Sequence, residues 1–202
     1  MKNMPDCKNF DLVLASASPR RKALLEEYGV DFRIAAADAE EISIPENGGE
    51  TVKANALAKA EKVFDLLRAK EDGEGDLSRT LLVLGADTVI ESGNRVLGKP
   101  SGIPDAENML LSLSGKTHKV ITGVALLSPQ KRKVFAVTTF VTFRKLSPEN
   151  IRSYMSKVFV LDKAGAYAAQ EHGDMIIEKM EGSMENVVGL PVAEILEELK
   201  NW

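Results

Sequence analysis

The segment Ser16-Ala17-Ser18-Pro19-Arg20-Arg21 brings together the groups that an anion-binding site requires. It follows a short apolar run and has the hydroxyl and proline pattern of a helix start. Backbone N–H groups at a helix start carry partial positive charge, hydroxyls add donors, and arginine binds phosphate oxygens in a fork. The segment therefore predicts a phosphate site, although an ordinary helix cap with two solvated arginines stays open for this segment alone.

Carboxylates follow two apolar runs that are predicted to be strands. Glu40 and Glu41 come after the run over 31–37, and Asp87 comes after the run over 80–86. Ligands of open α/β sheets bind at the carboxyl ends of strands, and Mg²⁺ beside substrate phosphates takes few protein oxygens. The pattern favours metal-assisted phosphate hydrolysis, although an acidic residue after a strand is also a common turn residue.

Lysines could balance the charge of a polyphosphate substrate. A site that cleaves a polyphosphate must offset several negative charges, and a metal ion together with Lys or Arg is the usual means. The candidates are Lys59, Lys99, Lys116 and Lys163, each of which taken singly reads as a solvated surface residue. The Gly-Lys-Thr sequence at 115–117 is not a P-loop, because Leu110 stands where that motif requires a glycine.

Covalent and zinc-dependent catalysis find little support in the sequence. His118 begins a predicted strand without a Ser or Cys nucleophile in a recognisable elbow. His172 lies in a glycine-rich loop without a second histidine at metal-ligand spacing. Cys7 lies in the N-terminal segment and is expected to be inert. A catalytic triad and a zinc hydrolase are therefore excluded.

Alternating helical and strand patterns must position these side chains. Apolar residues at helical spacing predict helices over 18–29, 50–70, 104–115, 147–157 and 191–200. Apolar and β-branched runs predict strands over 10–15, 31–37, 80–86, 118–128, 133–144 and 175–177. The fourth and fifth of these strands are expected to form an antiparallel pair, and the polar stretch 70–76 a surface loop. Interleaved strands and helices with a central hairpin predict an α/β fold with a mixed sheet.

Length and composition narrow the class of protein. The 202 residues, 44% hydrophobic and 28% charged, predict one soluble globular domain over 1–202, with two lobes. A net charge of −4 and only 5% aromatic residues disfavour binding to nucleic acid. The single cysteine rules out an intrachain disulfide, and no apolar run approaches the ~18 residues of a membrane-spanning helix. A cytoplasmic location is expected.

Eight motifs in order give the chain a resemblance to the Maf family of nucleotide pyrophosphatases, which are structurally related to the inosine triphosphate pyrophosphatases. The resemblance extends from Leu14 to Pro191 and is far more specific than any one motif. The motifs are Ser16–Arg21, the acidic pair ending in Glu41, Lys59-Ala60, Gly85–Val89, Leu97–Pro100, Ser114–Gly123, Asp162–Tyr167 and Asn186–Pro191.

The resemblance implies an activity and a set of site residues. It implies hydrolysis of a nucleoside triphosphate between its α- and β-phosphates, with a divalent cation, Mg²⁺ or Mn²⁺. Asp87 matches the proton acceptor that activates water and also a metal ligand, and Glu41 matches a metal-side carboxylate. The residues that match positions around the phosphates are Ser16, Arg21, Lys59 and Lys99. An elongated α/β fold with a deep cleft between two lobes, often found as a homodimer, is also implied.

Three further positions bear on the base of the nucleotide. The branch of the family that acts on dTTP and UTP has Arg, Thr and Gln at substrate-proximal positions, which match Arg20, Thr88 and Gln170. The branch that acts on 7-methyl-GTP tends to have Trp, Gln and Glu there. The resemblance therefore implies dTTP and UTP as substrates, with modified pyrimidine triphosphates as further candidates.

The sequence departs from the family pattern in two places and leaves two alternatives. Val158–Leu161 stands where relatives often have glycine-containing turns, and Met184 stands where they often have an aromatic residue; these departures bear on local loop shape and base affinity and not on the chemistry. The alternatives are a 7-methyl-GTP pyrophosphatase and a nucleotide-binding regulator of cell division or septum formation. The intact Asp87 argues against a protein that only binds.

Overall fold

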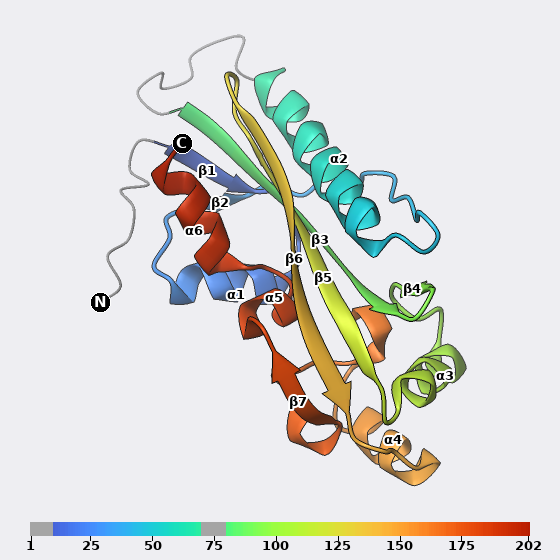
Figure 1. Cartoon of the computed structure of the whole chain (residues 1–202). Coiled ribbons are helices and arrows are strands. Elements are labelled where there is room, and N and C mark those ends of the chain that lie inside the picture. The colour runs from blue at the N-terminus through green and yellow to red at the C-terminus, as the bar shows by residue number, and fades with distance from the viewer. Residues whose placement is uncertain (1–9, 70–79) are drawn as a thin grey trace.

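The computed structural model describes residues 10–69 and 80–202, in which a seven-stranded mixed sheet is flanked by helices (Figure 1). The strand order is β2-β1-β3-β5-β6-β7, and β4 pairs with β3 off this path. The strands are β1 (Phe10–Leu14), β2 (Arg33–Ile34), β3 (Thr80–Ser92), β4 (Arg95–Leu97), β5 (Thr117–Leu127), β6 (Arg132–Phe143) and β7 (Ile177–Glu181). β1 runs parallel to β2 and β3, and the remaining pairs are antiparallel. The predicted α/β class and the β5–β6 hairpin are confirmed.

Helices cover both faces of the sheet. α2 (Gly48–Arg68) packs on one face, where its apolar side chains meet alternate residues of β3 such as Leu81 and Val83. α1 (Pro19–Glu27), α5 (Met184–Val188) and α6 (Val192–Lys200) lie on the opposite side (Figure 1). There α1 and α6 bury the intervening residues Leu82 and Leu84. Successive residues of β3 therefore pack on opposite faces of the sheet, because side chains alternate between the two faces along a strand.

Three long strands join two lobes. β3, β5 and β6 run from the end of the molecule covered by α1, α2 and α6 to the end that holds α3 (Ile103–Leu113) and α4 (Pro148–Met155) (Figure 1). At this second end, Ile90, Val120 and Val141 from the three strands join a separate apolar cluster with α3 and α4. Each lobe therefore has its own core, and the strands connect them.

An open edge of β3 lies between the two lobes. Pairing of β3 with β1 ends at Leu84, and pairing with β4 begins at Ile90. Among the described residues, no strand pairs with this edge between those two positions, whereas β5 pairs with the other edge throughout. Asp87 and Thr88 lie in this interval and direct their side chains to opposite faces of the sheet.

Two glycines let α2 lie directly on the sheet. A Cβ atom at Gly85 would lie 2.1 Å from the carbonyl oxygen of Ala56, and one at Gly123 would lie 2.3 Å from that of Val52. Any larger residue would force the helix away from β3 and β5. The absence of these side chains therefore brings the polar residues of α2 within reach of β3.

Several elements differ from the sequence-based expectations. β3 does not end before Asp87, because its pairing with β5 continues to Glu91. β2 has only two residues, β7 begins at Ile177 after a 3-10 turn over Gly173–Met175, and the short helix α5 was not predicted. Ser18 occupies the cap position of α1 but makes no side-chain capping bond. The predicted loop at 70–76 and Cys7 lie outside the described residues.

A search for membrane-spanning helices among the described residues finds none of sufficient length and apolarity.

Candidate active site

A cleft of about 780 Å³ opens along the free edge of β3. Its wall includes the start of α1, the segment 36–43, α2, the middle of β3, the turn at 98–99 and the segment 162–170. The nine residues matched through the family resemblance line it: Ser16, Arg20, Arg21, Glu41, Lys59, Asp87, Thr88, Lys99 and Gln170. Of the other candidates, Lys163 also lines the cleft, whereas Glu40 and Lys116 do not. The topology thus gathers residues from distant segments into one cavity.

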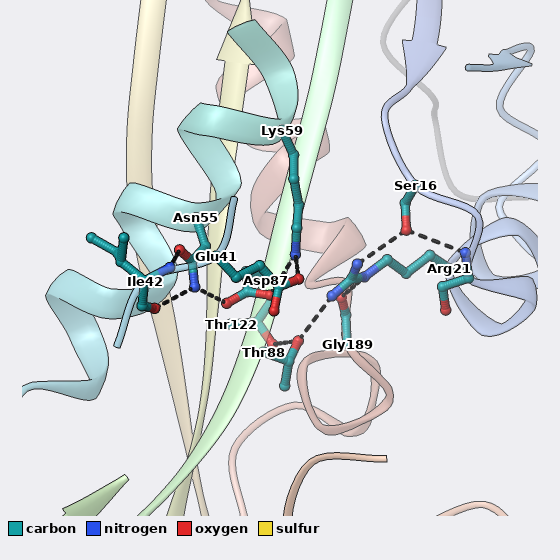
Figure 2. Close-up of polar contacts among 11 residues, drawn as sticks. Ser16, Arg21, Glu41, Ile42, Asn55, Lys59, Asp87, Thr88, Thr122 and Gly189 are labelled. Carbon is teal, nitrogen blue, oxygen red and sulfur yellow. Dashed lines mark hydrogen bonds and ion pairs between the residues drawn. The ribbon is translucent and has the colours of Figure 1, made fainter. Parts of the chain in front are cut away.

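Lys59 links the two predicted catalytic carboxylates. Its Nζ lies 2.7 Å from Glu41 Oε1 and 2.7 Å from Asp87 Oδ1 (Figure 2). The side chains of Lys59 and Asp87 are 16% and 10% exposed, whereas that of Glu41 is 53% exposed. One ammonium group therefore holds both carboxylates, one at the base of the cleft and one nearer its mouth.

The charge of Glu41 is stabilised by this contact. The hydrogen bond from Lys59 lowers the pKa of Glu41 below its ordinary value, against the opposing effect of partial burial. The positive charges of Lys99 and Arg21 act in the same direction. Glu41 is therefore ionised at neutral pH and available as an oxygen ligand for a cation.

Asn55 is a residue of this cluster that the sequence reasoning missed. It lies one helical turn before Lys59 on α2, is 3% exposed, and donates from Nδ2 to Asp87 Oδ2 at 3.0 Å. A sequence signal existed, because Asn55 interrupts an otherwise apolar face formed by Val52, Ala56 and Ala60. A polar side chain on such a face is buried and must find partners.

Arg21 contacts Thr88, the residue that follows Asp87, on the other face of the sheet. Its Nε donates to the Gly189 carbonyl at 2.8 Å, and its terminal nitrogens donate to Ser16 Oγ at 3.1 Å and Thr88 Oγ1 at 3.3 Å (Figure 2). Burial lowers the pKa of Arg21, and the negative charge of Asp87 opposes that shift. Arginine stays protonated in proteins, so the cleft holds a fixed positive charge here.

Thr88 supports Arg21 through a hydroxyl chain. Its Oγ1 lies 3.0 Å from Thr122 Oγ1, and that hydroxyl donates to the Asn186 carbonyl at 2.9 Å. Asn186 is fully buried and also donates to the Val120 carbonyl. The arrangement fixes Thr88 beside the guanidinium rather than leaving it free in the cleft.

Arg20 is held by the segment that follows α4. Its Nη1 donates to Asp162 Oδ2 at 2.7 Å, and its Nη2 donates to the Asp162 carbonyl at 3.3 Å. Lys163 donates to the other oxygen of Asp162. Burial alone would raise the pKa of Asp162, but the hydrogen bonds from Lys163 and Arg20 outweigh it and lower that pKa. Asp162 was not selected as a site residue from the sequence.

Lys99 and Gln170 lie at the exposed part of the cleft. Both residues are exposed, and each belongs to an irregular segment of the second lobe. They share the cavity with Asp87 but make no hydrogen bond or ion pair that would hold them to the other described site residues. Their side chains are therefore free to meet a ligand.

Comparison with known proteins agrees with this geometry. A protein family described as "Maf-like protein" matches residues 11–202. A dTTP/UTP pyrophosphatase of Akkermansia muciniphila is 46% identical over 188 residues, which cover 92% of this chain and 93% of that protein. Proteins of the same name from Geobacter sp. (strain M21) and Bacillus cereus (strain G9842) are each 41% identical, over 96% and 95% of both chains respectively. The chain belongs to the Maf-like protein family.

Proposed function

We propose that this protein hydrolyses dTTP and UTP to the nucleoside monophosphate and pyrophosphate. The observation that carries the proposal is the pair of carboxylates, Glu41 and Asp87, bridged by Lys59 in a cleft that also holds Arg21. The names of relatives that match almost the whole chain support this substrate class. The cleft is large enough for a nucleotide, because ligand pockets typically measure about 300–1,000 Å³.

Asp87 is the proposed proton acceptor. In the reaction, a water oxygen forms a bond to the α-phosphorus, and the bond from that phosphorus to the α,β-bridging oxygen breaks. Asp87 takes the proton that the attacking water loses, and pyrophosphate leaves with the bridging oxygen. Each carboxylate oxygen of Asp87 has one protein hydrogen-bond donor, so lone pairs remain for water.

Cations of the cleft are proposed to stabilise the leaving pyrophosphate. Arg21, Lys59 and Lys99 line the same cavity as Asp87 and supply positive charge from three separate segments. Negative charge grows on the leaving group in the transition state, so these interactions strengthen as the bond breaks. Ser16 is proposed to bind a phosphate oxygen beside Arg21, to which it is already hydrogen-bonded.

Glu41 and Asp87 are the proposed ligands of a divalent cation, Mg²⁺ or Mn²⁺. The donor set suits such an ion, because both carboxylates already converge on one positive charge. Among the described residues, no group of three or more His, Cys, Asp or Glu side chains could hold a metal ion, so substrate oxygens and water would complete the coordination. When bound, the cation would supply charge neutralisation and acidify water.

Arg20, Thr88 and Gln170 are proposed to select the base. They line one cleft, although Thr88 also supports Arg21 and Arg20 is held by Asp162. An amide that donates and accepts suits the imide edge of thymine or uracil, which presents two carbonyl acceptors around one N–H donor. A methylated guanine carries positive charge and would favour an aromatic face.

The test is a nucleotide panel with the purified protein in Mg²⁺ or Mn²⁺, with separate detection of pyrophosphate and orthophosphate. The proposal expects pyrophosphate from dTTP and UTP at kcat/KM values at least about tenfold above that for 7-methyl-GTP, since mismatched hydrogen bonds discriminate strongly. Equal turnover of 7-methyl-GTP would overturn the base selection. Release of orthophosphate instead of pyrophosphate would overturn the reaction itself.

A further inference from the structure

Asn55 connects the carboxylate of Asp87 to the backbone that follows Glu41 through a single amide group. Its Oδ1 accepts from the backbone N–H of Ile42 at 2.9 Å, and its Nδ2 donates to the carbonyl of the same residue at 3.0 Å. Nδ2 also donates to Asp87 Oδ2 at 3.0 Å (Figure 2). One buried side chain thus holds the backbone next to Glu41 and the carboxylate of Asp87 together.

The partners of Asn55 fix the orientation of its amide. The N–H of Ile42 can only donate, so it must face the amide oxygen, and the carbonyl of Ile42 can only accept, so it must face the amide nitrogen. The second hydrogen of that nitrogen is then directed at Asp87 Oδ2. The backbone of Ile42 therefore determines that Asp87 receives a donor, and an amide flip would break all three bonds.

Asn55 and Lys59 divide the two oxygens of Asp87 between them. Asn55 binds Oδ2, and Lys59 binds Oδ1 together with Glu41 Oε1. These contacts form a closed ring. Asn55 of α2 binds the backbone of Ile42, which adjoins Glu41 in the chain, and Lys59 of the same helix binds both Glu41 and Asp87. Asn55 closes the ring by binding Asp87. Rotation of the Asp87 carboxylate would break a bond on each side, so its plane is fixed relative to Glu41.

We infer that Asn55 is a positioning residue for the proposed hydrolysis, which sets the orientation of Asp87 and the separation of Asp87 from Glu41. This inference rests on the proposed function. Glu41 is half exposed and lies on an irregular segment, so its own contacts do not fix it as firmly as Asp87 is fixed. The amide of Asn55 ties that segment to the buried carboxylate at the point where the cation and the attacking water must meet.

Thr51 offers a matched control, because it anchors the same segment without touching Asp87. It lies one turn before Asn55 on α2 and is equally buried, at 2% exposure. Its hydroxyl oxygen accepts from the N–H of Ile44 at 2.9 Å and lies 2.9 Å from the Asn47 carbonyl. Thr51→Val removes these bonds at almost constant volume.

The experiment compares Asn55→Leu, Asn55→Asp and Thr51→Val with the wild type. Asn55→Leu removes all three bonds, whereas Asn55→Asp keeps the acceptor for Ile42 N–H and loses both N–H donors. Each protein is measured for kcat and KM with dTTP at saturating Mg²⁺, for the Kd of thymidine 5′-(α,β-imido)triphosphate, and for thermal unfolding. The non-hydrolysable analogue reports binding and an intact fold without turnover.

Both Asn55 variants are expected to lower kcat by about 10²-fold, because a displacement near 1 Å at the reacting groups can cost that much. Their KM and analogue Kd are expected to stay within about threefold of the wild type at saturating Mg²⁺, since Asn55 makes no hydrogen bond to Arg21 or Lys99, which are proposed to bind the phosphates. Thr51→Val is expected to keep kcat within about fivefold of the wild type, even if its unfolding temperature falls as far as those of the Asn55 variants.

Three results would overturn the inference. The first is a near-normal kcat in Asn55→Asp, and the second is a loss of kcat in Thr51→Val as large as that in the Asn55 variants. The third is a parallel loss of analogue binding and kcat in both Asn55 variants, which would indicate a merely structural role. A wild type that binds the analogue but releases no pyrophosphate from dTTP would instead overturn the proposed function, and this inference with it.

Discussion

Gly123 lies directly opposite Asp87 in the β3–β5 pair, on the face of the sheet that α2 covers. Opposite residues of an antiparallel pair direct their side chains to the same face. A side chain at this position would meet the backbone of Val52 and Lys53, so glycine is what allows the helix to approach Asp87. Because the backbone of α2 lies directly on the sheet here, the side chains of Asn55 and Lys59 reach the Asp87 carboxylate.

Gly85→Ala is expected to destabilise the protein and to slow catalysis together. The new Cβ would lie 2.1 Å from the Ala56 carbonyl oxygen, so α2 must move away from β3. Overpacking of this kind costs about 1–3 kcal/mol of the free energy of unfolding. The same shift moves Lys59 away from Asp87 and should lower kcat. Urea unfolding and dTTP turnover, measured on the same preparations, test both effects.

Gly49→Ala provides the control for this change. Gly49 lies in the first turn of the same helix, where a Cβ would be 3.7 Å from Asn47 Oδ1 in ordinary contact. Alanine there should leave kcat unchanged and add up to about 1 kcal/mol of stability. Equal behaviour of the two variants would contradict the close-approach argument.

Lys59→Met is expected to lower kcat by at least about 10²-fold, because it leaves Glu41 and Asp87 facing each other without the bridging charge. The pKa of Glu41 should rise, since the hydrogen bond from Lys59 is the largest cause of its depression. Steady-state kinetics with dTTP test the first expectation. Lys62→Met, at an exposed position of the same helix, should leave kcat near that of the wild type. Similar losses in both variants would show that the bridge has no special role.

Stability is expected to fall as the pH drops from about 6.5 to about 4, in part because of His118. This side chain is 2% exposed, bonded through Nε2 to Tyr167, and burial lowers its pKa to about 4. Between the two pKa values the unfolded chain binds a proton that the folded chain does not. The contribution of His118 to the free energy of unfolding is therefore fully present above pH 6.5, and it decreases by about 1.4 kcal/mol for each pH unit from there down to about pH 4.

His118→Gln should remove that part of the pH dependence. Urea unfolding at several values between pH 7 and pH 4.5 gives the comparison, in which the variant is less stable at pH 7 but has the shallower slope. Parallel pH profiles for the wild type and the variant would mean that His118 titrates normally in the folded protein.

Asp162→Asn is expected to raise the KM for dTTP and UTP by several-fold, about 3- to 10-fold, with kcat nearly unchanged. The change removes the charge that holds Arg20 through a 2.7 Å contact, so the guanidinium loses its fixed place at the cleft. Arg20 is proposed to contact the substrate equally in the ground and transition states, which is why KM alone should respond. A fall in kcat at constant KM would place Asp162 in the chemical step.

The sequence predicted the cleft residues better than it predicted the supports around them. Motifs carry the site side chains themselves, so the nine residues matched through the family resemblance line the same cavity, whereas the further candidates Glu40 and Lys116 lie outside it. Asn55 depends on the backbone of Ile42, and Asp162 depends on Arg20, which lies 142 residues away in the chain. The break in the apolar face of α2 indicates that Asn55 is buried, but the identity of such non-local partners leaves no local pattern in the sequence.

The fold differs from expectation for similar reasons. The apolar run of β3 is interrupted at Asp87 and Thr88, so the sequence predicts that the strand ends there, but pairing with β5 continues to Glu91 and pairing with β4 to Ser92. The short helix α5 ends at Gly189 with a positive φ of 116°, and its five residues are too few to show a helical period. Tertiary pairing decides these elements, and propensity alone does not.

Hydrolysis of dTTP in ¹⁸O-labelled water tests the central claim most directly. Because the proposed mechanism has a water beside Asp87 attack the α-phosphorus, the label should appear in dTMP and the pyrophosphate should be unlabelled. The Asp87→Asn variant should form labelled dTMP about 10²- to 10⁴-fold more slowly, as expected for loss of a proton acceptor. Label in the pyrophosphate, label in orthophosphate, or an unchanged rate in Asp87→Asn would contradict the account.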